Sequence, residues 1–157
     1  MLDRDIDLLR PLPIFAHFDE DQLRLIAFSA ERKEFESGSV VFREGELADS
    51  GLLVMEGSVL MTEAVDGEEV ERAIYGPGSL IGELALLTPT QRPATAIARA
   101  DSTFMVITRG LIRRILEEYP AAARELQAYL RERLTNFNED LKAARLMESA
   151  PAPGALN

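Results

Sequence analysis

Two side chains of opposite charge, Glu83 and Arg92, lie nine residues apart in a stretch that is otherwise apolar or uncharged. A guanidinium can bind phosphate oxygens in a bidentate manner. A carboxylate beside a phosphate would repel it, but it can accept hydrogen bonds from the hydroxyls of a sugar. The pair is therefore typical of a nucleotide site, although an arginine near a glutamate is by itself more often a surface ion pair.

The residues around this pair suit a close approach of the main chain to an anion. Gly82 precedes Glu83, and glycine lacks the Cβ atom that would keep a ligand away from the backbone. Residues 83–87 suit a single helical turn, whose first amides have no partner inside the helix. Because such amides bind phosphate, we expect N–H groups near Leu84 and Ala85 to contribute to the site.

The same stretch resembles the phosphate-binding cassette of cyclic nucleotide-binding domains. The family pattern is roughly G-E-(L/M)-A-L, a short loop and then R-x-A-(T/S), and this chain reads GELAL from residue 82 and RPAT from residue 92. The resemblance implies that Glu83 holds the ribose 2′-hydroxyl and that Arg92 holds the exocyclic phosphate oxygens. It implies further ligand contacts from the rest of the segment: Gly82, Leu84, Ala85, Pro93, Ala94 and Thr95.

Pro93 bears on which ligand is expected. In the family, the residue after the arginine often donates its backbone N–H to the cyclic phosphate, and proline has no N–H. One lost hydrogen bond of ~0.5–1.5 kcal/mol would weaken the affinity about tenfold. Relatives selective for cGMP commonly have Thr or Ser at this position, so the resemblance implies cAMP as the ligand, with cGMP as the second possibility.

A region of short strands surrounds this segment. Between residues 31 and 108, short apolar runs alternate with turns, and eight of the ten glycines fall between residues 38 and 82. Asp66-Gly67 between two such runs is a strong hairpin signal. Many short strands with glycine turns indicate an antiparallel sandwich or barrel.

The family resemblance extends over about residues 10–135, because its glycine positions recur at Gly38, Gly45, Gly57 and Gly78. It implies an eight-stranded antiparallel double-stranded β-helix, also called a jelly roll or β-roll, closed by flanking helices. The expected fold class is therefore mainly β with flanking α: a β-roll with N-terminal helices and a long C-terminal helix.

Helices are predicted on both sides of the strands. Asp19 lies three residues before Gln22, as in a capping box, and apolar residues follow at helical spacing. We expect residues 1–120 to form the β-roll domain with its N-terminal helices, residues 121–148 a C-terminal helix, and residues 149–157 a flexible tail.

The predicted C-terminal helix carries an apolar stripe. Its members, spaced by 4, 3, 4 and 3 residues, are Leu130, Leu134, Phe137, Leu141 and Ala144. This heptad spacing is typical of a coiled-coil seam, so one interpretation is a homodimer through this helix. The other is a helix that lies on its own β-roll as a lid, where Tyr129 or Phe137 could cap a ligand's base.

The composition limits the other classes of function. The formal net charge is −10, and residues 1–108 hold 9 basic against 20 acidic side chains, which disfavours binding to nucleic acid. There are no cysteines, no apolar run near the ~20 residues of a membrane span and no export signal. We therefore expect a cytoplasmic protein with no contact to membrane and no disulfide, metal or cofactor.

Two functions remain open. The first is a stand-alone cyclic nucleotide-binding signalling module that changes conformation on binding and acts on an unknown effector protein. It would lack the helix-turn-helix of catabolite activator protein-like regulators. The alternative is a β-roll interaction module that needs no nucleotide. An enzyme is not expected, because the single histidine, His17, lies away from any nucleophile pattern.

Overall fold

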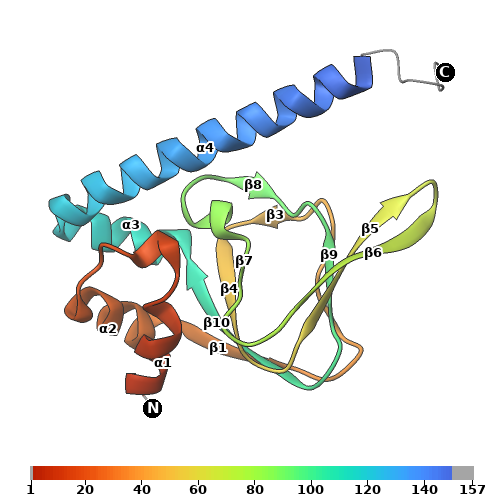
Figure 1. Ribbon diagram of the computed structural model, residues 1–157. Helices are drawn as coiled ribbons and strands as arrows, with labels where there is room; N and C mark the ends of the chain where they lie inside the picture. Colours follow the sequence, from red (N-terminus) through yellow and green to blue (C-terminus); the bar gives the residue numbers. More distant parts are fainter. Residues whose placement is uncertain (1, 150–157) are drawn as a thin grey trace.

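The computed structural model describes residues 2–149, together with the side chains of residues 2–133 and residue 135. Helices at both ends of the chain gather beside a β-roll (Figure 1). They are α1 (Leu2–Leu9), the 3₁₀ turn η1 (Pro13–Phe15), α2 (Glu20–Ser29), α3 (Arg109–Glu118) and α4 (Pro120–Ser149). Of the predicted tail, only Ser149 lies within the described residues, as the last residue of α4.

The strands pair in antiparallel fashion in three sheets. In chain order they are β1 (Glu31–Phe35), β2 (Val40–Phe42), β3 (Leu47–Ala48), β4 (Ser50–Glu56), β5 (Val59–Val65), β6 (Glu68–Tyr75), β7 (Leu80–Ile81), β8 (Thr90–Gln91), β9 (Thr95–Ala98) and β10 (Ser102–Thr108). The sheet orders are β1-β10-β4-β7, β2-β9-β5-β6 and β3-β8. This arrangement confirms the predicted fold class. The described residues hold ten strands instead of eight, because very short segments such as β3 and β8 pair separately.

Local sequence signals account for several of these elements. In β5 and β6, Val65 pairs with Glu68, and the two residues between them, Asp66 and Gly67, have φ of 51° and 82°. Positive φ at both central positions is what a type I′ hairpin turn requires, so the predicted hairpin is confirmed.

The predicted capping box of α2 is also present. The amide of Gln22 donates to Asp19 Oδ1, and the amide of Asp19 donates to Gln22 Oε1, both at 2.9 Å. A second polar contact joins α1 to the sheet, where buried Asp5 pairs with Arg32 of β1. Arg32 also donates to the carbonyl oxygens of Ala27 and Ala30 at the end of α2. These contacts hold the N-terminal helices against the strand that follows them.

The buried apolar residues form two clusters. The helical cluster joins the helices to one sheet and includes Phe15, Ile26, Leu53, Leu86, Met105, Ile112 and Leu126. The roll cluster lies inside the β-roll and includes Phe42, Val54, Val59, Met61, Ile81, Ala94, Ala96 and Phe104. Each fully buried large apolar side chain contributes about 1.5–3 kcal/mol. Leu86 belongs to the first cluster and Ala94 to the second, so the segment between them is anchored at both ends.

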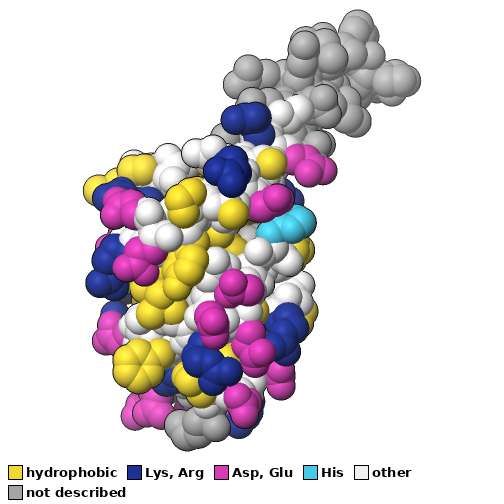
Figure 2. Space-filling model, turned by 90° about the vertical axis from the view of Figure 1, so that its left-hand side faces the viewer, with side chains coloured by type: hydrophobic (Ala, Val, Ile, Leu, Met, Phe, Trp, Pro, Cys, Tyr) yellow, Lys and Arg dark blue, Asp and Glu magenta, His cyan; other side chains and the backbone are white. Residues whose placement is uncertain are grey.

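Figure 2 shows the helical end of the molecule, where acidic and basic side chains are mixed around apolar groups. Phe28 of α2 is 79% exposed, although most other large apolar side chains of the helices are buried or half-buried. Within residues 2–149, no helix combines the length and the apolar character needed to cross a membrane.

Candidate ligand-binding site

The cassette, defined here as residues 82–95, connects the two clusters. It follows β7, whose Ile81 pairs with Leu52 of β4. Gly82 has φ 81° and ψ 37°, the left-handed conformation, and it turns the chain into the 3₁₀ turn η2 (Glu83–Leu86). Glycine adopts this conformation at little cost, whereas other residues adopt it rarely. The backbone at Gly82 therefore explains why a glycine precedes the acid.

Arg92 is buried, with 7% of its surface exposed. Its Nη2 donates a long hydrogen bond of 3.5 Å to Ser50 Oγ, while Nη1 is buried and has no partner in the described part of the chain. The Arg92 backbone is fixed to the turn before β3, because its N–H donates to the Glu46 carbonyl and its carbonyl accepts from the Gly45 N–H, both at 2.8 Å. The result is a buried cation that retains an unused donor.

The electrostatics of Arg92 favour an incoming anion. Burial lowers the pKa of the Arg92 guanidinium, while the nearby carboxylates of Asp49 and Glu46 raise it. A charge removed from water is costly unless it is paired and hydrogen-bonded. An anion that reached Nη1 would supply the missing partner.

Gly82 and Arg92 are in direct contact. A Cβ atom at position 82 would overlap Arg92 Nη1. The guanidinium therefore lies against the backbone that immediately precedes Glu83.

The carboxylate of Glu83 is held by α4. Tyr129 Oη donates to Glu83 Oε1 at 2.7 Å, and Arg133 Nε lies 3.2 Å from the same oxygen. The Glu83 side chain is 23% exposed, whereas that of Arg133 is 58% exposed. The pKa of Tyr129 is raised to about 12 by burial, by its hydrogen bond to Glu83 and by the negative charge of Glu83. Helix α4 therefore contacts the residue that would recognise a sugar.

The amides of η2 differ in part from the expectation. The Ala85 N–H donates to the Gly82 carbonyl at 3.0 Å, so it is not free for a ligand. The reason is the tight 3₁₀ turn, in which the third amide already has a carbonyl partner. In the described residues, the N–H groups of Glu83 and Leu84 make no hydrogen bond, so these two can still serve an anion.

The residues after Arg92 point in different directions. Pro93 is exposed, and Ala94 is buried among the apolar side chains of the roll cluster. Thr95 Oγ1 accepts a hydrogen bond of 2.9 Å from the Glu44 N–H. The Thr95 hydroxyl therefore stabilises a neighbouring turn, whereas the Ala94 side chain lies inside the roll.

Several contacts of the site were not predicted from the sequence. Phe42 lies beneath Arg92, with the guanidinium carbon 4.3 Å from the ring centroid. Arg109, the first residue of α3, donates to the carbonyl oxygens of Ala85 at 3.0 Å and Ala48 at 3.3 Å. Phe42 stands in an ordinary apolar strand run and Arg109 at a helix start, so neither carries a sequence signal for these contacts.

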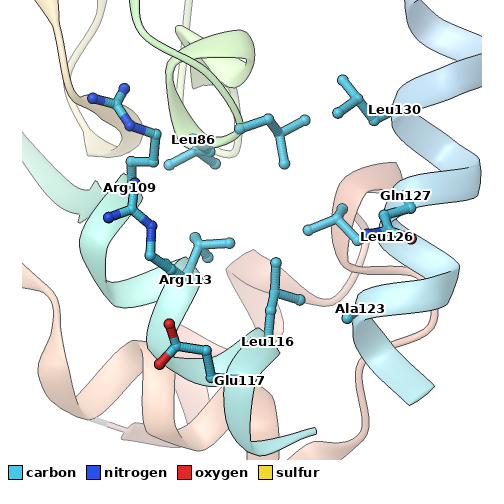
Figure 3. Close-up of a pocket in the computed structure, with 11 residues that line it drawn as sticks. Leu86, Arg109, Arg113, Leu116, Glu117, Ala123, Leu126, Gln127 and Leu130 are labelled. Atoms are coloured by element: carbon cyan, nitrogen blue, oxygen red, sulfur yellow. The ribbon is translucent and has the colours of Figure 1, made fainter. Parts of the chain in front are cut away.

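A pocket of about 350 Å³ lies between the end of η2, α3 and the first half of α4. Its wall is mainly apolar, and in Figure 3 Leu116 of α3 and Leu126 and Leu130 of α4 point into it. The remaining lining residues are Leu86, Leu87, Arg109, Ile112, Arg113, Glu117, Ala123 and Gln127. Helix α4 thus reaches Glu83 while leaving space beneath it.

A comparison with protein families identifies the domain. Residues 32–119, more than half of the chain, match the model of the cyclic nucleotide-binding domain. The chain therefore belongs to the cyclic nucleotide-binding domain family.

Among similar sequences is the cyclic AMP receptor protein of Thermus thermophilus, 29% identical over 82% of this chain. Another is a cAMP-dependent protein kinase regulatory subunit of Blastocladiella emersonii, 31% identical over 76%. The chain spans 60% of the first protein and 30% of the second.

Solved structures share the fold. The N-terminal domain of a transcriptional regulator from Streptomyces coelicolor has a TM-score of 0.78 and 32% identity, covering 86% of this chain and 95% of that one. A cyclic nucleotide-binding-like protein from Brucella abortus has a TM-score of 0.69 and 37% identity, covering 72% and 97%. The regulatory domain of Toxoplasma gondii PKA, crystallised with cAMP, has a TM-score of 0.70 and 27% identity, covering 78% and 46%.

Proposed function

We propose that this chain is a signalling module that binds a 3′,5′-cyclic nucleotide, with cAMP preferred to cGMP. The observation that carries the proposal is the buried Arg92 guanidinium, which has an unpartnered Nη1 against Gly82, directly before Glu83. Support also comes from the relatives, whose names include a cyclic AMP receptor protein and a cAMP-dependent kinase subunit.

Each cassette residue has a specific role in this proposal. Arg92 neutralises the cyclic phosphate, helped by the free amides of Glu83 and Leu84. Glu83 accepts a hydrogen bond from the ribose 2′-hydroxyl. Pro93 offers neither an N–H nor a hydroxyl, and the Thr95 hydroxyl is already bonded to the Glu44 amide. The preference for cAMP rests on the absence of a hydroxyl at position 93, directly after Arg92.

We further propose that the ligand acts on α4. Tyr129 and Arg133 join α4 to the carboxylate that would bind the ribose, so a nucleotide at Glu83 would change the contact that holds the helix. The pocket between the end of η2 and the C-terminal helices leaves space for both to move. A signal arises only if the two arrangements bind the nucleotide with different affinity.

The remaining parts of the proposal rest on the sequence. An effector protein would read the position of α4, and the module itself would catalyse no reaction. The apolar stripe of the C-terminal helix favours a homodimer, and the absence of cysteine fits the cytoplasm.

Isothermal titration calorimetry with cAMP and cGMP tests the binding. Circular dichroism first shows that the protein is folded, and its ultraviolet absorbance shows that it carries no bound nucleotide. We expect heat with cAMP, weaker binding of cGMP, and no measurable binding in Arg92→Ala. Arg92→Lys keeps the charge but loses the planar fork, so it should bind with intermediate affinity. If neither nucleotide gives a heat of binding, the result would instead favour the nucleotide-independent interaction module.

A further inference from the structure

The ring of Phe42 lies against the Arg92 guanidinium. The guanidinium carbon lies 4.3 Å from the ring centroid, and the two residues are only 6% and 7% exposed. A cation over an aromatic face is attracted to it, and the attraction is stronger when both groups are removed from water. The face of the Phe42 ring is therefore in position to hold the charge inside the roll.

Two nearby carboxylates also interact with the charge of Arg92. The carboxylates of Asp49 and Glu46 attract its charge, and both residues are exposed. On the buried side, the single hydrogen bond of the Arg92 guanidinium to the described residues is the long 3.5 Å contact with Ser50 Oγ. One long neutral hydrogen bond is weak compared with an ion pair.

We propose that Phe42 is a positioning residue that keeps the Arg92 guanidinium against Gly82, where a phosphate can reach it, instead of paired with Asp49 or Glu46. The phosphate part of this inference rests on the proposed function. The placement of Arg92 in the free protein does not depend on any ligand.

The matched pair of variants is Phe42→Leu and Phe104→Leu. Both residues belong to the roll cluster, but Phe104 stacks edge-on against Phe35, with ring centroids 5.6 Å apart. In the free protein, NMR of the Arg92 Nε–Hε group should show a ring-current shift that Phe42→Leu abolishes and Phe104→Leu retains. In calorimetry, Phe42→Leu should bind cAMP about tenfold more weakly, the size expected for one desolvated cation–π contact.

A double variant separates positioning from packing. Adding Asp49→Asn to Phe42→Leu removes one of the competing carboxylates, so most of the lost affinity should return. Asp49→Asn alone is the reference, because removing a negative charge strengthens phosphate binding in any background, and only a larger gain in the Phe42→Leu background indicates positioning. Thermal melting confirms that each variant is folded. If Phe42→Leu does not fold, Phe42→Met is used in its place.

Three results would decide against the inference. They are unchanged cAMP affinity in folded Phe42→Leu, an equal loss in Phe104→Leu, and no ring-current shift on Arg92 in the parent protein. If the parent shows the shift, and only the Phe42 variant loses it, but no cyclic nucleotide binds, then the proposed function fails and the positioning of Arg92 is supported.

Discussion

The hydroxyl of Tyr129 donates a hydrogen bond of 2.7 Å to Glu83 Oε1, which joins α4 to the cassette. Arg133, one helical turn further along α4, contacts the same oxygen at 3.2 Å. Two donors from one helix therefore converge on the acid proposed to bind the ribose. This contact gives the C-terminal helix a direct physical connection to the candidate site, which packing against the β-roll alone would not provide.

The Tyr129–Glu83 contact predicts an unusual titration. The pKa of Tyr129 is raised from 10.0 to about 12, because burial and the Glu83 carboxylate both disfavour the phenolate. The pKa of Tyr129 is higher in the folded than in the unfolded protein. The contribution of the Tyr129–Glu83 contact to folding stability is therefore fully present below pH 10 and is lost as the pH rises toward about 12. Ultraviolet titration of the three tyrosines should show one late transition, absent in Tyr129→Phe and shifted to lower pH in Glu83→Gln. An identical curve for Tyr129→Phe would contradict the contact.

Gly82→Ala should abolish ligand binding and also lower the free energy of unfolding. Alanine at a φ of 81° is strained, and its methyl group would displace Arg92 Nη1. Gly67→Ala is the matched control, because Gly67 has a φ of 82° but nothing near its missing Cβ. Both variants should lose about 1–2 kcal/mol of unfolding free energy in urea. Only Gly82→Ala should lose cAMP binding by calorimetry, and equal binding in the two would refute the role of the Gly82–Arg92 contact.

The local features of this protein could be predicted from its sequence. Asp19 and Gln22 form the expected capping box, and Asp66-Gly67 form the expected hairpin turn. Both signals depend on residues that are close together in the chain. The Glu83–Arg92 spacing was equally local, since one short turn and one loop carry both side chains.

The long-range contacts of the site could not be predicted in the same way. Phe42 reaches Arg92 because β2 pairs with β9, and Ser50 reaches it from β4. Such pairing depends on how distant strands are ordered in the sheets, which the alternation of apolar residues does not specify. The sequence is compatible with Tyr129 as a cap for a base, and no sequence pattern distinguishes that role from its hydrogen bond to Glu83.

The Asp5–Arg32 pair should contribute to stability, because Asp5 is buried and its partner is only one-third exposed. Asp5→Asn would leave the Arg32 charge without its counter-ion, and we expect a loss of about 1–3 kcal/mol in the free energy of unfolding. The exposed pair Asp7–Arg10 provides the control. Its side chains are 71% and 54% exposed, so Asp7→Asn should change stability by less than about 0.5 kcal/mol. Urea unfolding followed by circular dichroism measures both, and equal losses would show that burial of the pair is not what matters.

The apolar stripe of the C-terminal helix predicts a homodimer that a single charge can disrupt. Leu141 is an interior member of the stripe, so Leu141→Glu should place a carboxylate in the seam and separate the subunits. Thr135, next to stripe residue Leu134 and exposed on α4, is the control position. Sedimentation equilibrium should give twice the chain mass for the parent and for Thr135→Glu, and the single chain mass for Leu141→Glu. A parent protein that sediments as a single chain at all concentrations would assign the stripe to packing within one molecule.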